Sequence, residues 1–263
     1  MSLRSRLGAA RRWLLCSVYR RTVPFGNCGA IVSFSFDDFP RTAYSVGGAV
    51  LEHFGARGTY YAAAGLMNTS NELGDQFRCE DIDSLLEKGH ELASHTFSHL
   101  SCRSVSGAAF REDVEKGRQA IEKMTGFESS NFAYPFGHVT LQAKRSLSVA
   151  SARSIFPGFN GPEIDLNLLR ANSLYGDLDG AAHAEELILE NVKRRGWLVF
   201  YTHDVRPQPS PHGCTSELLE ATVSSALRNG CRILTVKDAL AEAGVRNGNP
   251  NGQVQECLSS CFR

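Results

Sequence analysis

Two adjacent carboxylates, Asp37 and Asp38, end the apolar run at residues 31–36. Two negative charges this close repel each other unless a cation or a proton lies between them. Adjacent residues at a strand end point in different directions, so one aspartate can bind a metal ion while the other faces its water as a general base. The structural alternative is a carboxylate pair that begins the next helix, near Pro40.

His95 and His99 are spaced four residues apart. On a helical turn this spacing places both imidazoles on one face, within reach of one ion. Alone, the pair could be two unrelated histidines. Together with a carboxylate it forms the His-His-Asp set of catalytic zinc sites, which leaves positions for water and substrate. The residue types therefore predict a metal-assisted hydrolase.

His203 follows the apolar run at residues 198–202. It could be a buried core histidine, but at a strand end it is placed to protonate a leaving group opposite the metal. Asp204 would orient it, although neighbours in the chain need not be in contact. The proline-rich loop 207–214 follows, and either it lines the substrate site, with His212 as a contact, or it is a stiff connection.

The elements that must position these residues alternate between strands and helices, which is typical of βαβ units and a parallel sheet. Seven or eight such units without a break in composition predict one α/β domain, a closed (β/α) barrel over residues 26–245. The candidate residues all fall at carboxyl ends of expected strands, the rim where such barrels bind ligands. Strands are expected at 30–38, 58–64, 91–94, 131–134, 152–156, 197–202 and 231–236, and helices at 43–54, 80–88, 106–124, 139–150, 181–195, 215–228 and 236–243.

The composition is that of an ordinary globular protein, with 263 residues, 42% hydrophobic and 21% charged, and no net charge. It gives no reason to expect nucleic acid as a partner. Eight cysteines are scattered without paired spacing, which is typical of reduced thiols. In the polar tail at 246–263, Cys257 and Cys261 would lack two further ligands for a metal site.

Residues 1–25 carry six arginines and no acidic residue. They predict either a basic amphipathic helix on an anionic membrane surface or an ordinary packed first helix. The apolar part at 13–18 is too short for a signal peptide or a membrane span. We therefore expect a cytoplasmic protein, with peripheral membrane contact as one alternative.

Four motifs resemble those of the polysaccharide deacetylase family, the NodB-homology carbohydrate esterases. Residues 35–39 (Ser-Phe-Asp-Asp-Phe) are similar to its Thr-Phe-Asp-Asp-Gly, and residues 95–99 to its His-Ser/Thr-x-x-His. Residues 135–137 match Pro-Tyr/Phe-Gly, and 200–203 match an apolar strand ending in histidine. The resemblance implies a distorted (β/α) barrel, a divalent metal, usually zinc with cobalt or nickel as alternatives, and removal of an N- or O-acetyl group from a sugar.

The resemblance also implies a role for each matching residue. Asp37 would be the base, and Asp38 would bind the metal with His95 and His99. His203 would be the acid that protonates the departing amine. The remaining implied contacts are the backbone N–H of Phe136 on the oxyanion, Tyr201 at the acetyl methyl, and Tyr134 and Pro135 beside the substrate.

The chain departs from the family pattern at three points. Phe39 replaces the glycine of the first motif, so we expect a narrower or more apolar mouth. The arginine that contacts the base in the third motif is absent, and the fourth motif is not visible. We predict that Arg170 pairs with Asp37 in its place, the alternative being an ordinary surface arginine.

The sequence thus predicts a metal-dependent sugar N-deacetylase that releases acetate. Because no export signal is visible, we expect a nucleotide- or lipid-linked precursor of a surface polysaccharide as substrate. One alternative is a hydrolase of another small-molecule amide, imide or ester on the same barrel. The other is a non-catalytic glycan-binding protein.

Overall fold

The structure, a computed structural model, describes residues 3–26 and 28–245. The predicted tail with Cys257 and Cys261 lies outside the described residues. The described residues cover most of the predicted basic segment at 1–25 and of the predicted barrel at 26–245.

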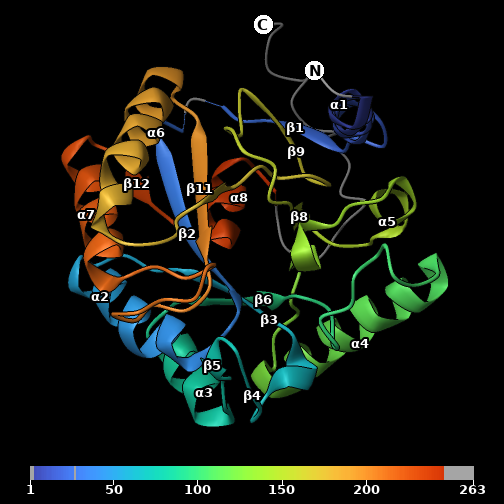
Figure 1. The fold of residues 1–263 in the computed structure, drawn as a ribbon, viewed down its shortest axis with the longest axis horizontal. Helices are drawn as coiled ribbons and strands as arrows, with labels where there is room; N and C mark the ends of the chain where they lie inside the picture. Colours follow the sequence, from blue (N-terminus) through green and yellow to red (C-terminus); the bar gives the residue numbers. More distant parts are fainter. Residues whose placement is uncertain (1–2, 27, 246–263) are drawn as a thin grey trace, which may run out of the picture.

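A curled parallel sheet forms the centre of the fold (Figure 1). Its strand order is β10 (Asn172–Ser173), β11 (Trp197–Thr202), β2 (Ile31–Asp38), β3 (Thr59–Ala62), β6 (Glu91–Ser94), β7 (Asn131–Ala133) and β8 (Ser151–Arg153), and β12 (Arg232–Ile233) pairs with the first half of β2. Backbone bonds from Leu169 N to Ala152 O and from Ser154 N to Leu169 O, both 2.9 Å, attach the stretch before β10 to β8. The two edges of the sheet are thereby joined, and the predicted α/β barrel is confirmed.

Helices cover the outside of this sheet (Figure 1). Ser106 and Thr215, where two helices are expected to begin, cap α4 and α7 by accepting hydrogen bonds from Ala109 N and Leu218 N. The helices are α1 (Leu3–Ser17), α2 (Ala49–His53) after a π-helical turn at Ala43–Gly48, α3 (Cys79–Glu87), α4 (Gly107–Thr125), α5 (Leu141–Ser146), α6 (Ala181–Arg194), α7 (Ser216–Arg228) and α8 (Val236–Glu242).

Strands β2 and β11 form the middle of the core, and every residue in both is buried. Strands covered on both faces need apolar or hydrogen-bonded side chains on each side. Phe34 and Phe200 stack between the sheet and the helices, with ring centroids 5.8 Å apart. On the other face, Trp197 Nε1 donates a 2.9 Å hydrogen bond to Ser33 Oγ. These contacts fix β2 rigidly, and β2 carries the two aspartates.

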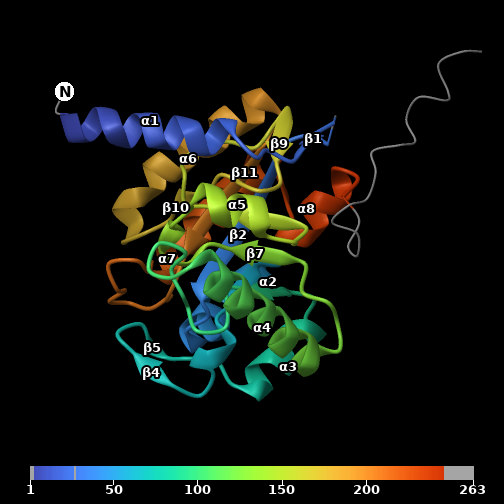
Figure 2. The ribbon, with the colours of Figure 1, turned by 90° about the vertical axis from the view of Figure 1, so that its right-hand side faces the viewer.

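The N-terminal segment packs along one side of the barrel. Strand β1 (Thr22–Pro24) pairs antiparallel with β9 (Glu163–Asp165), and α1 lies beside α5 (Figure 2). Leu15 of α1 is buried, and its carbonyl accepts a 2.8 Å bond from Lys144 Nζ. Within the described chain no helix is both long and apolar enough to cross a membrane. The six cysteines of the described residues, Cys16, Cys28, Cys79, Cys102, Cys214 and Cys231, are free thiols.

Candidate metal centre and active site

Asp37 and Asp38 are the last two residues of β2, and they face different partners because side chains alternate along a strand. Asp37 Oδ1 accepts a hydrogen bond from Arg153 Nη2. Asp38 instead faces two histidines. Both carboxylates are buried, with 4% and 7% of their surface exposed, so each needs a cationic partner.

Asp38, His95 and His99 form a cluster whose ligand atoms lie within 4.8 Å of one another. Asp38 Oδ1 is 3.0 Å from His99 Nε2 and 3.5 Å from His95 Nε2, yet it accepts no well-aligned hydrogen bond from any described group. His95 Nδ1 lies 2.9 Å from Ala133 O, and donation of its proton there leaves the Nε2 lone pair facing Asp38. Lone pairs that converge in this way fit a divalent cation, and the donor set suits zinc or cobalt.

The protonation states of Asp38 and His95 also favour the binding of a cation. Burial alone would raise the pKa of Asp38, but the contact with His99 and the charges of His95 and His203 hold that pKa well below its usual range. Burial lowers the pKa of His95 to about 4. Carboxylate and neutral imidazole are the forms that bind metal ions.

The turn between the two histidines is not helical, so the predicted helical turn is wrong. His95 follows β6, and the chain then bends with positive φ at Thr96 (64°) and His99 (53°). Asp113 of α4 holds the bend by accepting the backbone N–H of Phe97 (3.2 Å) and Ser98 (3.0 Å). A helical turn needs its own backbone bonds, and here α4 supplies the partners instead.

Arg153, and not Arg170, is the partner of Asp37, so the predicted pairing is wrong. Arg153 extends from β8 into the barrel, is 1% exposed, and lies between the rings of Tyr61 and Tyr201 at 4.9 and 5.1 Å. Arg170 instead donates to the carbonyl of Pro157 at 3.1 Å. The sequence holds a signal for Arg153, because a lone charge in the short strand Ser151–Arg153 must find a buried partner.

Phe39 and Tyr134 do not line the mouth of the site as predicted. Phe39 is fully buried, and its ring stacks on Phe77 with centroids 4.9 Å apart. Its backbone keeps the left-handed conformation, φ 63°, that glycine adopts most readily. Tyr134 is 1% exposed, and its hydroxyl donates to Asn167 O at 3.2 Å on the outer side of the sheet. Strand alternation directs it away from the barrel interior.

The turn at 135–137 borders the histidine cluster. Pro135 is buried, whereas Phe136 is 56% exposed. The Phe136 ring lies 4.4 Å from the His99 ring and 5.6 Å from that of His138, and its φ is 58°. Positive φ also occurs at Asp38 and His99, and such strained backbone is concentrated at functional sites.

His203 directly follows β11 at this rim, and its charge is among the causes of the low pKa of Asp38. Its Nδ1 lies 3.1 Å from the carbonyl oxygen of His212, in the loop after β11. Asp204 does not orient it as predicted, because that carboxylate bonds Ser210 and lies 2.7 Å from Arg206 Nε. Tyr201 and His212 both contact the ring of Tyr175, at 5.5 and 5.6 Å.

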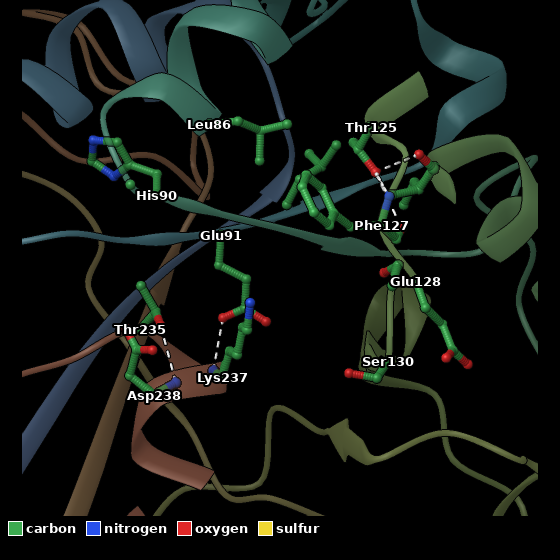
Figure 3. Close-up of a pocket in the computed structure, with 14 residues that line it drawn as sticks. Leu86, His90, Glu91, Thr125, Phe127, Glu128, Ser130, Thr235, Lys237 and Asp238 are labelled. Atoms are coloured by element: carbon green, nitrogen blue, oxygen red, sulfur yellow. Dashed lines mark hydrogen bonds between the residues drawn. The ribbon is translucent and has the colours of Figure 1, made fainter. Parts of the chain in front are cut away.

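A pocket of about 290 Å³ lies at the other end of β6, away from this site (Figure 3). Its carboxylate Glu91 accepts bonds from Thr59 Oγ1 and the Lys237 N–H, both 2.8 Å, and from Asn131 Nδ2, 2.7 Å. Burial raises the pKa of Glu91, which these three donors oppose. A carboxylate so fully bonded within the fold stabilises the barrel, so this pocket is not the candidate active site.

Comparison with known proteins agrees with this fold. The sequence profile of the family described as polysaccharide deacetylase matches residues 27–153. A comparison with curated protein sequences found no match. The family comprises metal-dependent deacetylases, the class of enzyme expected from the motifs.

Solved structures share the fold at low sequence identity. The Xyl-CE4 domain of a multidomain xylanase from the hindgut metagenome of Trinervitermes trinervoides is 18% identical, with TM-score 0.60 over 86% of this chain and 100% of that one. A family 4 acetyl xylan esterase from Clostridium thermocellum, in complex with a cobalt ion, is 17% identical, with TM-score 0.60 over 82% and 93%. The peptidoglycan deacetylase PdaC from Bacillus subtilis is 14% identical, with TM-score 0.51 over 83% and 93%. The resemblance seen in the motifs is therefore confirmed over residues 27–153, which match the polysaccharide deacetylase family, and the whole fold is shared with these solved structures.

Proposed function

We propose that this protein removes an N-acetyl group from a saccharide with the help of a divalent metal ion. Asp38, His95 and His99 hold this ion, and zinc is the first candidate for it. The observation that carries the proposal is the convergence of these three ligand atoms within 4.8 Å beside a separate buried carboxylate, Asp37. His203, from another strand, supplies an imidazole on the same rim. The family of residues 27–153 supports acetylated sugars as the substrate class.

Each residue has a distinct task in this reaction. When bound, the metal would polarise the acetyl carbonyl and acidify water. Asp37, held by Arg153, takes the proton from the attacking water. The backbone N–H of Phe136 donates to the oxygen of the acetyl group as negative charge develops there. His203, with Nδ1 held by the His212 carbonyl, donates a proton from Nε2 to the sugar nitrogen, and acetate leaves.

An O-acetyl ester is the second candidate substrate. Two of the structures that share the fold are described as an acetyl xylan esterase and as a domain of a xylanase. An alkoxide leaving group needs less help from a general acid than an amine does. Loss of His203 should therefore impair N-deacetylation more than O-deacetylation, which acetate release from matched N- and O-acetylated sugars would measure.

The metal assignment is tested by metal analysis together with acetate release. Asp38→Asn and His95→Ala should lose metal and activity together. Asp37→Asn should keep the metal and lose activity, because it changes the base and not a ligand. His53→Ala, an exposed histidine on α2, is the control and should change neither. Equal metal loss in Asp37→Asn and Asp38→Asn would contradict the division of the two aspartates.

A further inference from the structure

Two arginines near the candidate active site form no ion pair with any carboxylate of the described residues. Arg11 of α1 and Arg103, four residues after His99, are both exposed. Within the described part of the chain no carboxylate forms an ion pair with either. Arg20, by contrast, lies 2.7 Å from Glu163. Guanidinium groups that gather without an acidic partner repel one another, and an anion would relieve that repulsion.

The packing of α1 brings the segments that carry these two arginines onto one hydrophobic cluster. Leu15 is buried in the same hydrophobic cluster as Cys102, the residue before Arg103. Arg11 lies four residues before Leu15, so it extends from the same face of the helix, one turn nearer the N-terminus. Both positive charges also reach one neighbouring side chain. Burial lowers the pKa of His138 most, and the charges of Arg103 and Arg11 lower it further.

A continuous line of contacts joins this patch to the metal ligands. The His99 ring lies 4.4 Å from Phe136, and the Phe136 ring 5.6 Å from His138. His138 Nδ1 lies 2.7 Å from Ser101 Oγ, two residues before Arg103. In Figure 2 the N-terminal end of α1 and the β4–β5 hairpin (Ser70–Asn71 and Gly74–Asp75) lie on the same side of the molecule. The patch therefore adjoins the rim on which the sugar would bind.

We propose that Arg11 and Arg103 bind a phosphate group carried by the saccharide substrate, adjacent to the residue that loses its acetyl group. This inference rests on the proposed deacetylase function and adds the substrate class, a phosphate-linked sugar. Guanidinium groups match phosphate oxygens in charge and in bidentate geometry. Two of them suit the dianionic charge of a phosphate monoester better than the single charge of a carboxylate. The exposed ring of Phe136 offers a face for the sugar between phosphate and metal.

The test compares two substrates that differ only in the group on the anomeric oxygen: N-acetylglucosamine 1-phosphate, and the methyl glycoside of N-acetylglucosamine. We expect the metal-loaded protein to show a kcat/KM about tenfold higher for the phosphate at low salt, and a smaller preference as salt rises. Arg11→Ala and Arg103→Ala should each reduce this preference, and Arg103→Lys should retain part of it. Arg111→Ala, an exposed arginine on α4, is the matched control and should keep the full preference.

Failure of the inference can be told apart from failure of the function. Acetate release from the methyl glycoside and from chitotetraose without any phosphate preference would overturn the phosphate site and leave the deacetylase intact. No release from any acetylated sugar would overturn both. Vesicles with and without phosphatidylglycerol separate the two sources of phosphate. Arginine-dependent binding to the anionic vesicles, with no preference for the phosphorylated sugar, would assign the patch to the membrane and overturn the substrate site.

Discussion

The pairing of Arg153 with Asp37 determines where the proposed base can point. Arg153 is fixed between two aromatic rings, at 4.9 Å from Tyr61 and 5.1 Å from Tyr201. A buried guanidinium packed against two rings has little freedom to move, so it fixes the position of the carboxylate that it binds. Arg153 is therefore a positioning residue that acts on substrate through Asp37.

We predict that Arg153→Lys lowers kcat about 100-fold with little change in KM, because an ammonium cannot reproduce the planar contact. Arg170→Met should keep wild-type kinetics, since Arg170 donates a hydrogen bond to Pro157 and not to Asp37.

In Arg153→Ala, added guanidinium at non-denaturing concentration should restore part of the activity. Absence of rescue in a folded variant that retains its metal would argue against a positioning role.

Phe39 combines a backbone conformation that suits glycine with a side chain that the core needs. Phe39→Gly should relieve about 1 kcal/mol of left-handed strain. It should also lose about 3–5 kcal/mol of aromatic packing against Phe77 and Tyr60. We therefore predict a net loss of about 2–4 kcal/mol in the free energy of unfolding, measured in urea. A variant as stable as the wild type would show that the ring contributes little to the core.

At the scale of elements, strand β6 serves a different purpose at each end. Its carboxyl end leads into His95, whereas its amino end is preceded by His90. His90 Nδ1 accepts the backbone N–H of Gly58 at 3.0 Å, so the folded protein requires a neutral ring. Burial lowers the pKa of His90 below its ordinary value of 6.5, although Glu52 partly opposes this.

The hydrogen bond from Gly58 N–H to His90 Nδ1 makes the free energy of unfolding depend on pH. Below about pH 6.5 the unfolded chain takes up a proton at His90 while the folded protein does not. Stability is therefore lost as pH falls through this range, by up to about 1.4 kcal/mol per pH unit for one proton. His90→Asn keeps an acceptor for Gly58 but does not titrate, so its unfolding free energy should differ less between pH 7.5 and 5.5 than that of the wild type. An identical pH dependence in both proteins would contradict the assignment.

The sequence predicts elements better than it predicts side-chain partners. Continuous apolar runs identify β2 and β11, and Ser106 and Thr215 mark helix starts, because these signals are local. The pairing of Asp37 with Arg153 is not local, since it depends on which strand lies across the barrel. The non-helical turn after His95 likewise depends on Asp113, a partner from a different helix.

At the scale of the whole molecule, the barrel separates chemistry from stability. The carboxyl ends of β2, β6 and β11 carry the residues that we propose as metal ligands, base and acid. The opposite end contains the bonds of Glu91 to three other segments, of which Figure 3 shows the one to Lys237. Such a division is typical of (β/α) barrels. It implies that changes at Glu91 affect folding and leave the site intact in those molecules that fold.

We predict that Glu91→Gln lowers the free energy of unfolding by about 1–3 kcal/mol, because an amide nitrogen would face a donor where the carboxylate now accepts. Glu91→Ala should lower it by about 3–5 kcal/mol, since three donors then lose their acceptor. Urea unfolding measures both, with Glu87→Gln on the exposed side of α3 as control. Metal content and kcat per folded molecule should stay at wild-type values, because Glu91 and His95 lie at opposite ends of β6. A loss of metal in folded Glu91→Gln would show that the two ends of the barrel are coupled.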